Sequence, residues 1–212
     1  LAFLLGGLSV VFIAWLRSTD ALALMPQRAW NNMTQYLLAA IPLFIFMASM
    51  LEKSGVIEEV FDVAYKWLGR IPGGLAVATV VASTVLAAMV GVIGAAVVTM
   101  ALVALPSMLR RGYSPVLAVG TVMAGGTLGI LIPPSVLAIV YGLVANQSVG
   151  ELYLGSVFPG LVRSGMYILF SVGYALLNPK AAPRLSPEVT PTWSERWRAL
   201  RSIWSPLVLI FL

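Results

Sequence analysis

Residues 125–135, GGTLGILIPPS, are the part of this sequence whose residue types can do chemistry inside a membrane. Glycines let a helix unwind, and its last carbonyl groups then become free to bind a cation. A proline pair can start a second helix, whose first N–H groups point into the same gap and can bind an anion. Irregular backbone at membrane depth survives only where protein buries it or where it lines a cavity. The stretch therefore predicts a protected site for Na⁺ and an anionic group.

The composition places this stretch in an all-α polytopic membrane protein. Of the 212 residues 60% are hydrophobic and only 10% are charged, and the mean hydropathy is +0.96. Uncharged runs at 29–51, 71–109 and 112–150 each exceed the roughly 20 residues that a helical crossing needs. The chain begins at Leu1 and stops within an apolar run, so we expect a piece of a larger protein.

Residue types that are absent from the sequence exclude several kinds of chemistry. There is no Cys and no His, which removes disulfides, zinc or haem ligation, thiol nucleophiles and imidazole catalysis within these residues. The net charge of +5 needs no nucleic acid, because Lys and Arg collect in the cytoplasmic loops of membrane proteins. In the topology expected here only Arg17 and Arg28 lie outside, and Arg163 lies in or near the last membrane segment. There it is typical of a snorkelling interfacial residue rather than a substrate clamp.

Charge and hydropathy together divide the chain into six segments. These are scaffold transmembrane helices (1–53), an amphipathic interfacial arm helix (54–70), a helical hairpin (71–111), a discontinuous transmembrane helix (112–149), a further transmembrane helix (150–178), and a cytoplasmic linker with an interfacial helix and the start of the next crossing (179–212).

Two of these segments leave alternatives open. The amphipathic pattern of the arm helix favours a position at the membrane interface, but packing against another helix explains it nearly as well. The hairpin has positive charge at both ends, which two crossings or one re-entrant hairpin explain equally, although its halves are short for a core of about 30 Å. The run 115–145 must cross an odd number of times if the flanking arginines lie inside, so it is one crossing with a break in the middle.

The break also has simpler interpretations. A Gly-x-x-x-Gly pattern is typical of close helix contacts, and a proline pair is typical of a kink. The hydroxyls of Ser83, Thr84, Thr99 and Thr121 usually bond to carbonyls of their own helix. Glycines and prolines together, in a run of this length, favour a functional break.

The order of the motifs resembles one transporter family. AIPLFIFMASMLEKSGV precedes the amphipathic segment, and the hairpin, AGGTLGILIPPSVLAIVYGLVAN and SVGELYLGSVFPGL follow it. Over about residues 36–165 this order is similar to the large membrane subunit of tripartite ATP-independent periplasmic (TRAP) transporters, of the dicarboxylate permease type.

The resemblance implies the N-terminal half of an inverted-repeat, elevator-type transporter with a re-entrant hairpin and a discontinuous helix. Such a permease moves Na⁺, the coupling ion, together with a small organic acid anion across the bacterial inner membrane. It implies no covalent cofactor. The implied partners are a small membrane subunit, a periplasmic substrate-binding protein and the lipid bilayer.

Carried onto this sequence, the resemblance places the ligands at the hairpin tip and the break. The implied Na⁺ residues are Val90, Gly91, Gly94, Gly125, Thr127 and Gly129. The implied substrate residues are Gly126, Pro133, Pro134 and Ser135. Many family members have Ser-Ser-Thr where this chain has Gly-Gly-Thr at 125–127, so carbonyl groups are the favoured ligands here.

Other functions remain as alternatives. A different Na⁺-coupled dicarboxylate or citrate-type permease would have the same broken helix but would work without a periplasmic binding protein. An intramembrane enzyme is disfavoured, because residues 71–150 contain no His, Cys, Asp or Glu. A purely structural membrane scaffold is a third class.

Overall fold

The computed structural model describes residues 2–16, 22, 24–183 and 197, and all regular structure in these residues is helical. This confirms the predicted all-α class. Three described segments are long and apolar enough to cross a membrane: Tyr36–Lys53, Ile93–Arg110 and Val149–Leu177. The linker and interfacial helix expected towards residue 212 lie outside the described residues from 184 on, apart from Trp197.

The chain divides into two compact units, the first of which ends at Ala40. This unit holds α1 (Ala2–Leu16), α3 (Leu24–Met33) and the 3₁₀ helix η1 (Tyr36–Ala39). The large apolar side chains of α1 are exposed, with Phe3 at 97% and Trp15 at 81%. In a membrane such a helix presents these side chains to lipid or to other helices.

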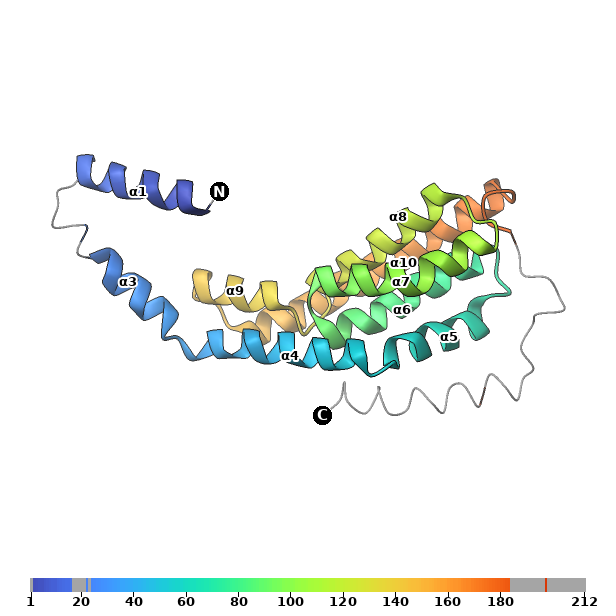
Figure 1. Ribbon diagram of the computed structural model, residues 1–212, viewed down its shortest axis with the longest axis horizontal. Helices are drawn as coiled ribbons and strands as arrows, with labels where there is room; N and C mark the ends of the chain where they lie inside the picture. The colour runs from blue at the N-terminus through green and yellow to red at the C-terminus, as the bar shows by residue number, and fades with distance from the viewer. Residues whose placement is uncertain (1, 17–21, 23, 184–196, 198–212) are drawn as a thin grey trace. The chain divides into compact units, whose positions relative to one another are not determined.

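The second unit, from Ile41 on, positions the candidate site. It consists of α4 (Ala40–Lys53), α5 (Val56–Leu68), α6 (Gly74–Val90), α7 (Ile93–Arg110), α8 (Pro115–Gly126), η2 (Thr127–Ile130), α9 (Val136–Ala145) and α10 (Val149–Leu177). Figure 1 shows α6, α7, α8 and α10 side by side, with α5 along α6.

Helix α6 forms the centre of this unit because it is apolar on all sides. Thirteen of its 17 residues are buried, and it contacts α5, α7, α8 and α10. Small residues such as Ala76, Ala78 and Ala82 let neighbouring helices approach closely. At its start the N–H of Leu75 donates to the hydroxyl of Tyr113, 3.2 Å away, which satisfies one of the free donors of the first turn. Burial raises the pKa of that tyrosine.

The arm helix α5 packs against α6, and its interfacial position stays a prediction. Ile57, Val60 and Phe61 are buried on the contacting side, whereas Asp62 is exposed and pairs with Lys66 at 3.1 Å. The guanidinium of Arg111 lies 4.6 Å from the centre of the Tyr65 ring and joins the far end of α7 to the arm.

The hairpin and the broken helix have sharper boundaries than the sequence suggested. The turn between α6 and α7 consists of Gly91 and Val92 alone, so that Gly94 lies in the first turn of α7 and not at the tip. Helix α8 continues to Gly126, and α9 begins only at Val136. Between them lie η2 and the non-helical residues 131–135. Whether the hairpin is re-entrant stays a prediction.

Candidate functional site

The hairpin tip and the break, 40 residues apart in the sequence, are in direct contact. Gly91 has a φ of +62°, a conformation that glycine adopts at little cost. Its carbonyl accepts a hydrogen bond from the N–H of Val136 at 3.4 Å, and a Cβ added to it would overlap the carbonyl oxygen of Pro134. The backbone of Val92 and Ile93 also lies against Gly129. The two irregular points therefore form one site.

Unpaired carbonyl groups occur at the second part of the break. The carbonyls of residues 131–134 accept no hydrogen bond from the described part of the chain, whereas the carbonyl of Leu128 accepts two. The peptide between Pro133 and Pro134 is cis. Neutral carbonyl oxygens are hard ligands that suit an alkali cation. Such carbonyls are candidate ligands for the Na⁺ ion that the sequence predicts.

Protein groups already accept hydrogen bonds from some of the backbone N–H groups in the first turn of α9. The Ser135 hydroxyl accepts from the N–H of Ala138 at 3.4 Å, and the N–H of Val136 donates to the hairpin tip. Ser135 itself is buried, and its carbonyl accepts from the Tyr153 hydroxyl at 3.3 Å. Fewer N–H groups are therefore open to an anion here than the sequence indicates.

Two glycines at the end of α8 permit close contact with the hairpin. A Cβ on Gly126 would overlap the Val97 side chain on α7, and a Cβ on Gly125 would overlap the Ser83 hydroxyl on α6. That hydroxyl is buried and has no hydrogen-bond partner among the described residues. A buried hydroxyl without a partner is costly unless a ligand or water satisfies it. Ser83 is thus a further possible oxygen ligand.

Helix α10 forms a third wall of the site. Gly160 lies against Ile132, at 2.8 Å from an added Cβ to Cγ1 of that isoleucine. About two turns further along α10, the Tyr167 hydroxyl lies 3.4 Å from the hydroxyl of Thr127, which donates to the carbonyl of Ala124 at 2.7 Å. Thr127 therefore joins the break to α10 rather than to the hairpin tip.

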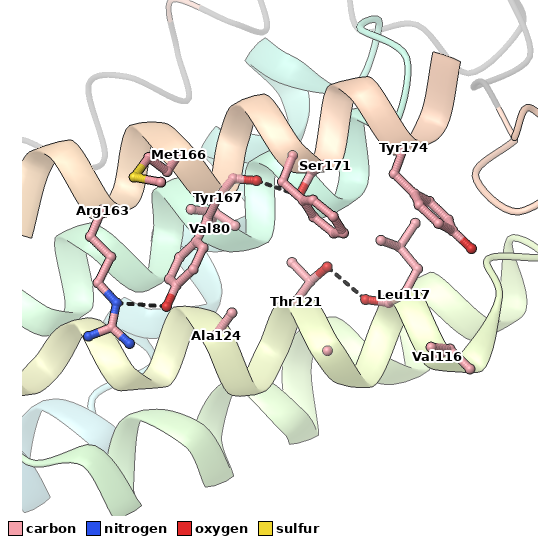
Figure 2. Close-up of a pocket in the computed structure, with 12 residues that line it drawn as sticks. Val80, Val116, Leu117, Thr121, Ala124, Arg163, Met166, Tyr167, Ser171 and Tyr174 are labelled. Atoms are coloured by element: carbon pink, nitrogen blue, oxygen red, sulfur yellow. Dashed lines mark hydrogen bonds between the residues drawn. The ribbon is translucent and has the colours of Figure 1, made fainter. Parts of the chain in front are cut away.

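A groove of about 570 Å³ runs between α8 and α10 beside this contact. Its walls are mainly apolar, and Arg163 is the only charged residue among those that line it. Figure 2 shows Arg163 at one end of the groove and Tyr174 towards the other, with the Arg163 Nε bonded to the Tyr167 hydroxyl. The volume suits a small organic molecule.

The structure thus brings most of the predicted residues into one region. Val90 ends α6 beside the tip, Gly91 meets Pro134 and Ser135 directly, and Gly129 lies against the next residues of the tip, Val92 and Ile93. Gly94 is apart from this contact, since a Cβ on it would meet no atom within 4 Å.

Sequence reasoning missed the contribution of α10 and of one carboxylate. Arg163, Tyr167 and Tyr153 all face the break or its groove. The sequence did contain a signal for Arg163, because a lone arginine inside a long apolar segment is typical of a functional site. The carboxylate of Glu52 on α4 accepts from the Thr99 hydroxyl on α7 at 3.4 Å, which no spacing pattern indicated.

Comparison with known proteins gives a family match along the whole chain. The family model described as "Tripartite ATP-independent periplasmic transporter, DctM component" matches residues 1–212. The chain is 35% identical to the C4-dicarboxylate TRAP transporter large permease protein of Vibrio cholerae, over 100% of this chain and 46% of that protein. The corresponding protein of Pseudomonas aeruginosa is 32% identical over 97% of this chain and 47% of its own length.

A relative with a different transported compound in its name is also similar. The ectoine TRAP transporter large permease protein of Halomonas elongata is 31% identical over 82% of this chain and 40% of its own length. The chain thus spans about half the length of the relatives it matches.

Proposed function

The chain belongs to the DctM family of tripartite ATP-independent periplasmic transporters, and on this premise we propose that it is part of a permease that carries an organic acid anion. The relatives are transporters and not enzymes. We place the protein in the bacterial inner membrane and expect Na⁺ as the coupling ion, with symport of the two solutes.

The observation that carries this proposal is the contact between the hairpin tip and the break. Gly91 and Pro134 meet through backbone atoms, next to the four unpaired carbonyls of residues 131–134. Discontinuous helices with free carbonyls bind coupling ions at the bilayer midplane of secondary transporters. The proposed Na⁺ ligands are oxygens of Val90, Gly91, Gly125, Thr127 and Gly129, which are the implied residues other than Gly94, since Gly94 lies within α7 and away from the contact. The carbonyls of 131–134 and the Ser83 hydroxyl extend that set.

The compounds named for the relatives support a substrate that carries a carboxylate. C4-dicarboxylates and ectoine differ in size and in net charge, but both carry a carboxylate. A site that serves this family must therefore recognise at least one carboxylate. The specific acid for this chain is to be found by experiment.

The proposed mechanism is of the elevator type, in which one block of helices carries the site across the membrane. The tight association of α6, α7, α8 and α10 around the break supports a block that moves as a unit. The proposed partners are a small membrane subunit and a periplasmic binding protein that delivers the anion.

Reconstitution tests this proposal. The permease that contains this chain and its small subunit are placed in liposomes, and uptake of a labelled organic acid is measured. The acid is chosen beforehand as one that stabilises the binding protein against heat. We expect uptake that needs both an inward Na⁺ gradient and the loaded binding protein.

Two results would contradict parts of the proposal. Uptake without the binding protein would favour the alternative, a Na⁺-coupled dicarboxylate or citrate-type permease that works alone. Uptake that persists after Na⁺ is replaced by choline on both sides would exclude sodium coupling.

A further inference from the structure

We propose that Arg163 binds the anionic group of the transported acid, and that Tyr167 holds its guanidinium in position. This inference rests on the proposed function and adds a residue that neither the sequence motifs nor the break supplies. It starts from the position of Arg163 in α10. Arg163 is the middle residue of this 29-residue helix, about 21 Å from either end at 1.5 Å per residue.

Such a position does not suit an interfacial arginine. For a helix centred in a bilayer with a hydrocarbon core of about 30 Å, Arg163 lies near the midplane. Its side chain does not extend along the helix into water, because Nε donates to the Tyr167 hydroxyl at 2.7 Å. The guanidinium carbon lies 5.5 Å from the centre of the Tyr167 ring. These contacts and the position in the helix favour a charge held inside the membrane segment over a snorkelling arginine.

This charge has no partner carboxylate among the described residues. The hydrogen bond to Tyr167 uses only Nε, and the four N–H groups on the two Nη atoms make no hydrogen bond with the described part of the chain. A charge at membrane depth is costly unless it is paired, and intramembrane arginines therefore mark ligand sites or ion pairs. Arg163 can donate two parallel N–H bonds to the two oxygens of one carboxylate in a fork geometry.

The surroundings of Arg163 favour a small ligand as its partner. The guanidinium lies at one end of the mainly apolar groove of about 570 Å³, with Ala124 of α8 on the opposite wall (Figure 2). The hydroxyls of Thr121 and Ser171 along this groove donate to carbonyls of their own helices. The groove thus offers one strong anion-binding group and otherwise apolar walls, which fits a carboxylate attached to a small carbon skeleton.

The same contacts tie the anion to the break. Tyr167 contacts Arg163 through one side of its hydroxyl and Thr127 through the other, so that Nε and the Thr127 hydroxyl are at most about 6 Å apart. An anion at Arg163 therefore binds beside the proposed Na⁺ region and can respond to the occupancy of that region.

Arg163→Gln in the complete permease tests the inference, with Arg110→Gln as the matched control. Arg110 is exposed at the end of α7 and loses the same charge. Uptake by the reconstituted system and thermal stabilisation of the purified permease are measured with succinate, ectoine and acetate as probes. We expect Arg163→Gln to raise the half-saturating anion concentration by about 10- to 100-fold, which is the usual effect of losing a charge-assisted hydrogen bond. Arg110→Gln should leave it unchanged.

Two further variants separate binding from a structural role. Arg163→Lys keeps the charge but lacks the planar fork, and should weaken anion binding by several-fold. Tyr167→Phe should raise the half-saturating concentration without lowering the maximal rate in proportion. If Arg163→Gln does not fold, Arg163→Lys carries the test.

Several outcomes would overturn the inference. One is an unchanged half-saturating concentration in Arg163→Gln, or in Arg163→Lys where that variant carries the test. Another is a loss of thermal stability with anion affinity preserved, which would assign Arg163 to an ion pair within the protein. A third is a wild-type permease that none of the probes stabilises. If wild-type uptake proves independent of Na⁺ while the probes still stabilise the permease in an Arg163-dependent way, the coupling proposal fails and this inference stands.

Discussion

Replacement of Gly91 by alanine perturbs the contact between the hairpin tip and the break most directly. The residue sits in the left-handed region with a φ of +62°, and the position of its missing Cβ is taken by the carbonyl oxygen of Pro134. That oxygen belongs to the backbone, so no side-chain rotation can make room. Either the tip or the 131–135 segment must move.

The expected cost follows from two terms. A non-glycine residue in the left-handed region costs about 1–2 kcal/mol, and insertion of a methyl group into a filled space costs about 1–3 kcal/mol. Separation of the two segments also weakens the bond from the N–H of Val136 to the carbonyl of Gly91, which contributes about 1 kcal/mol. The first two terms sum to about 2–5 kcal/mol and the weakened bond adds up to about 1, so we expect Gly91→Ala to lose about 2–6 kcal/mol of stability, or to displace the tip and abolish transport.

Gly94→Ala provides the control within the same hairpin. Gly94 lies in α7, and an added Cβ would meet no atom within 4 Å, so alanine there should be neutral or stabilise the helix by up to about 1 kcal/mol. Both variants are compared in the reconstituted permease by thermal unfolding and by uptake. Equal stability and equal uptake for Gly91→Ala and Gly94→Ala would refute the proposed contact.

Three further changes test other parts of the unit. Gly125→Ala should destabilise the protein by about 1–3 kcal/mol, because the added Cβ overlaps the Ser83 side chain. In thermal unfolding, the double variant Gly125→Ala with Ser83→Gly should recover part of this loss. Strictly additive effects of the two substitutions would argue against the contact. Thr127→Val keeps the shape but removes a hydroxyl of the break, and should weaken the dependence of uptake on Na⁺ several-fold; an unchanged dependence would remove Thr127 from the site. Tyr113→Phe should cost about 1–3 kcal/mol because the N–H of Leu75 loses its acceptor. Burial raises the pKa of Tyr113, so its contribution to stability is complete below the ordinary tyrosine value of about 10 and is lost as the pH rises above it. The alkaline decrease in unfolding free energy should be shallower in Tyr113→Phe, and identical slopes would contradict this.

Local sequence signals were sufficient to locate the break and the turn of the hairpin. Glycines and prolines change the backbone whatever surrounds them, so the interruption near residues 125–135 and the turn at Gly91 follow from residue type. The exact ends of the helices could not be predicted from residue type. Helix α8 stays helical through Gly125 and Gly126, because both glycines lie in buried contacts with α6 and α7. Tertiary contact decided these boundaries.

The third wall of the site could not be derived from periodicity. Helix α10 is apolar along most of its length, so no hydrophobic stripe indicates which side faces the break. The orientation is visible only once Gly160 packs against Ile132 and Tyr167 reaches Thr127. An arginine in an apolar segment has two ordinary interpretations, and its depth along the helix, which depends on where α10 begins and ends, distinguishes them.

The position of Arg163 gives a physical basis for coupling between the two proposed ligands. The Thr127 hydroxyl lies at most about 6 Å from Nε of Arg163. At about 6 Å two like charges repel by about 3 kcal/mol at an effective dielectric constant of about 20, so a Na⁺ ion at this hydroxyl would be repelled by the guanidinium. An anion bound to Arg163 removes most of this repulsion. Anion binding should therefore favour Na⁺ binding, and by linkage Na⁺ should favour the anion to the same extent. If both proposals hold, a site of neutral oxygens beside one fixed positive charge would bind the two solutes together more readily than either alone.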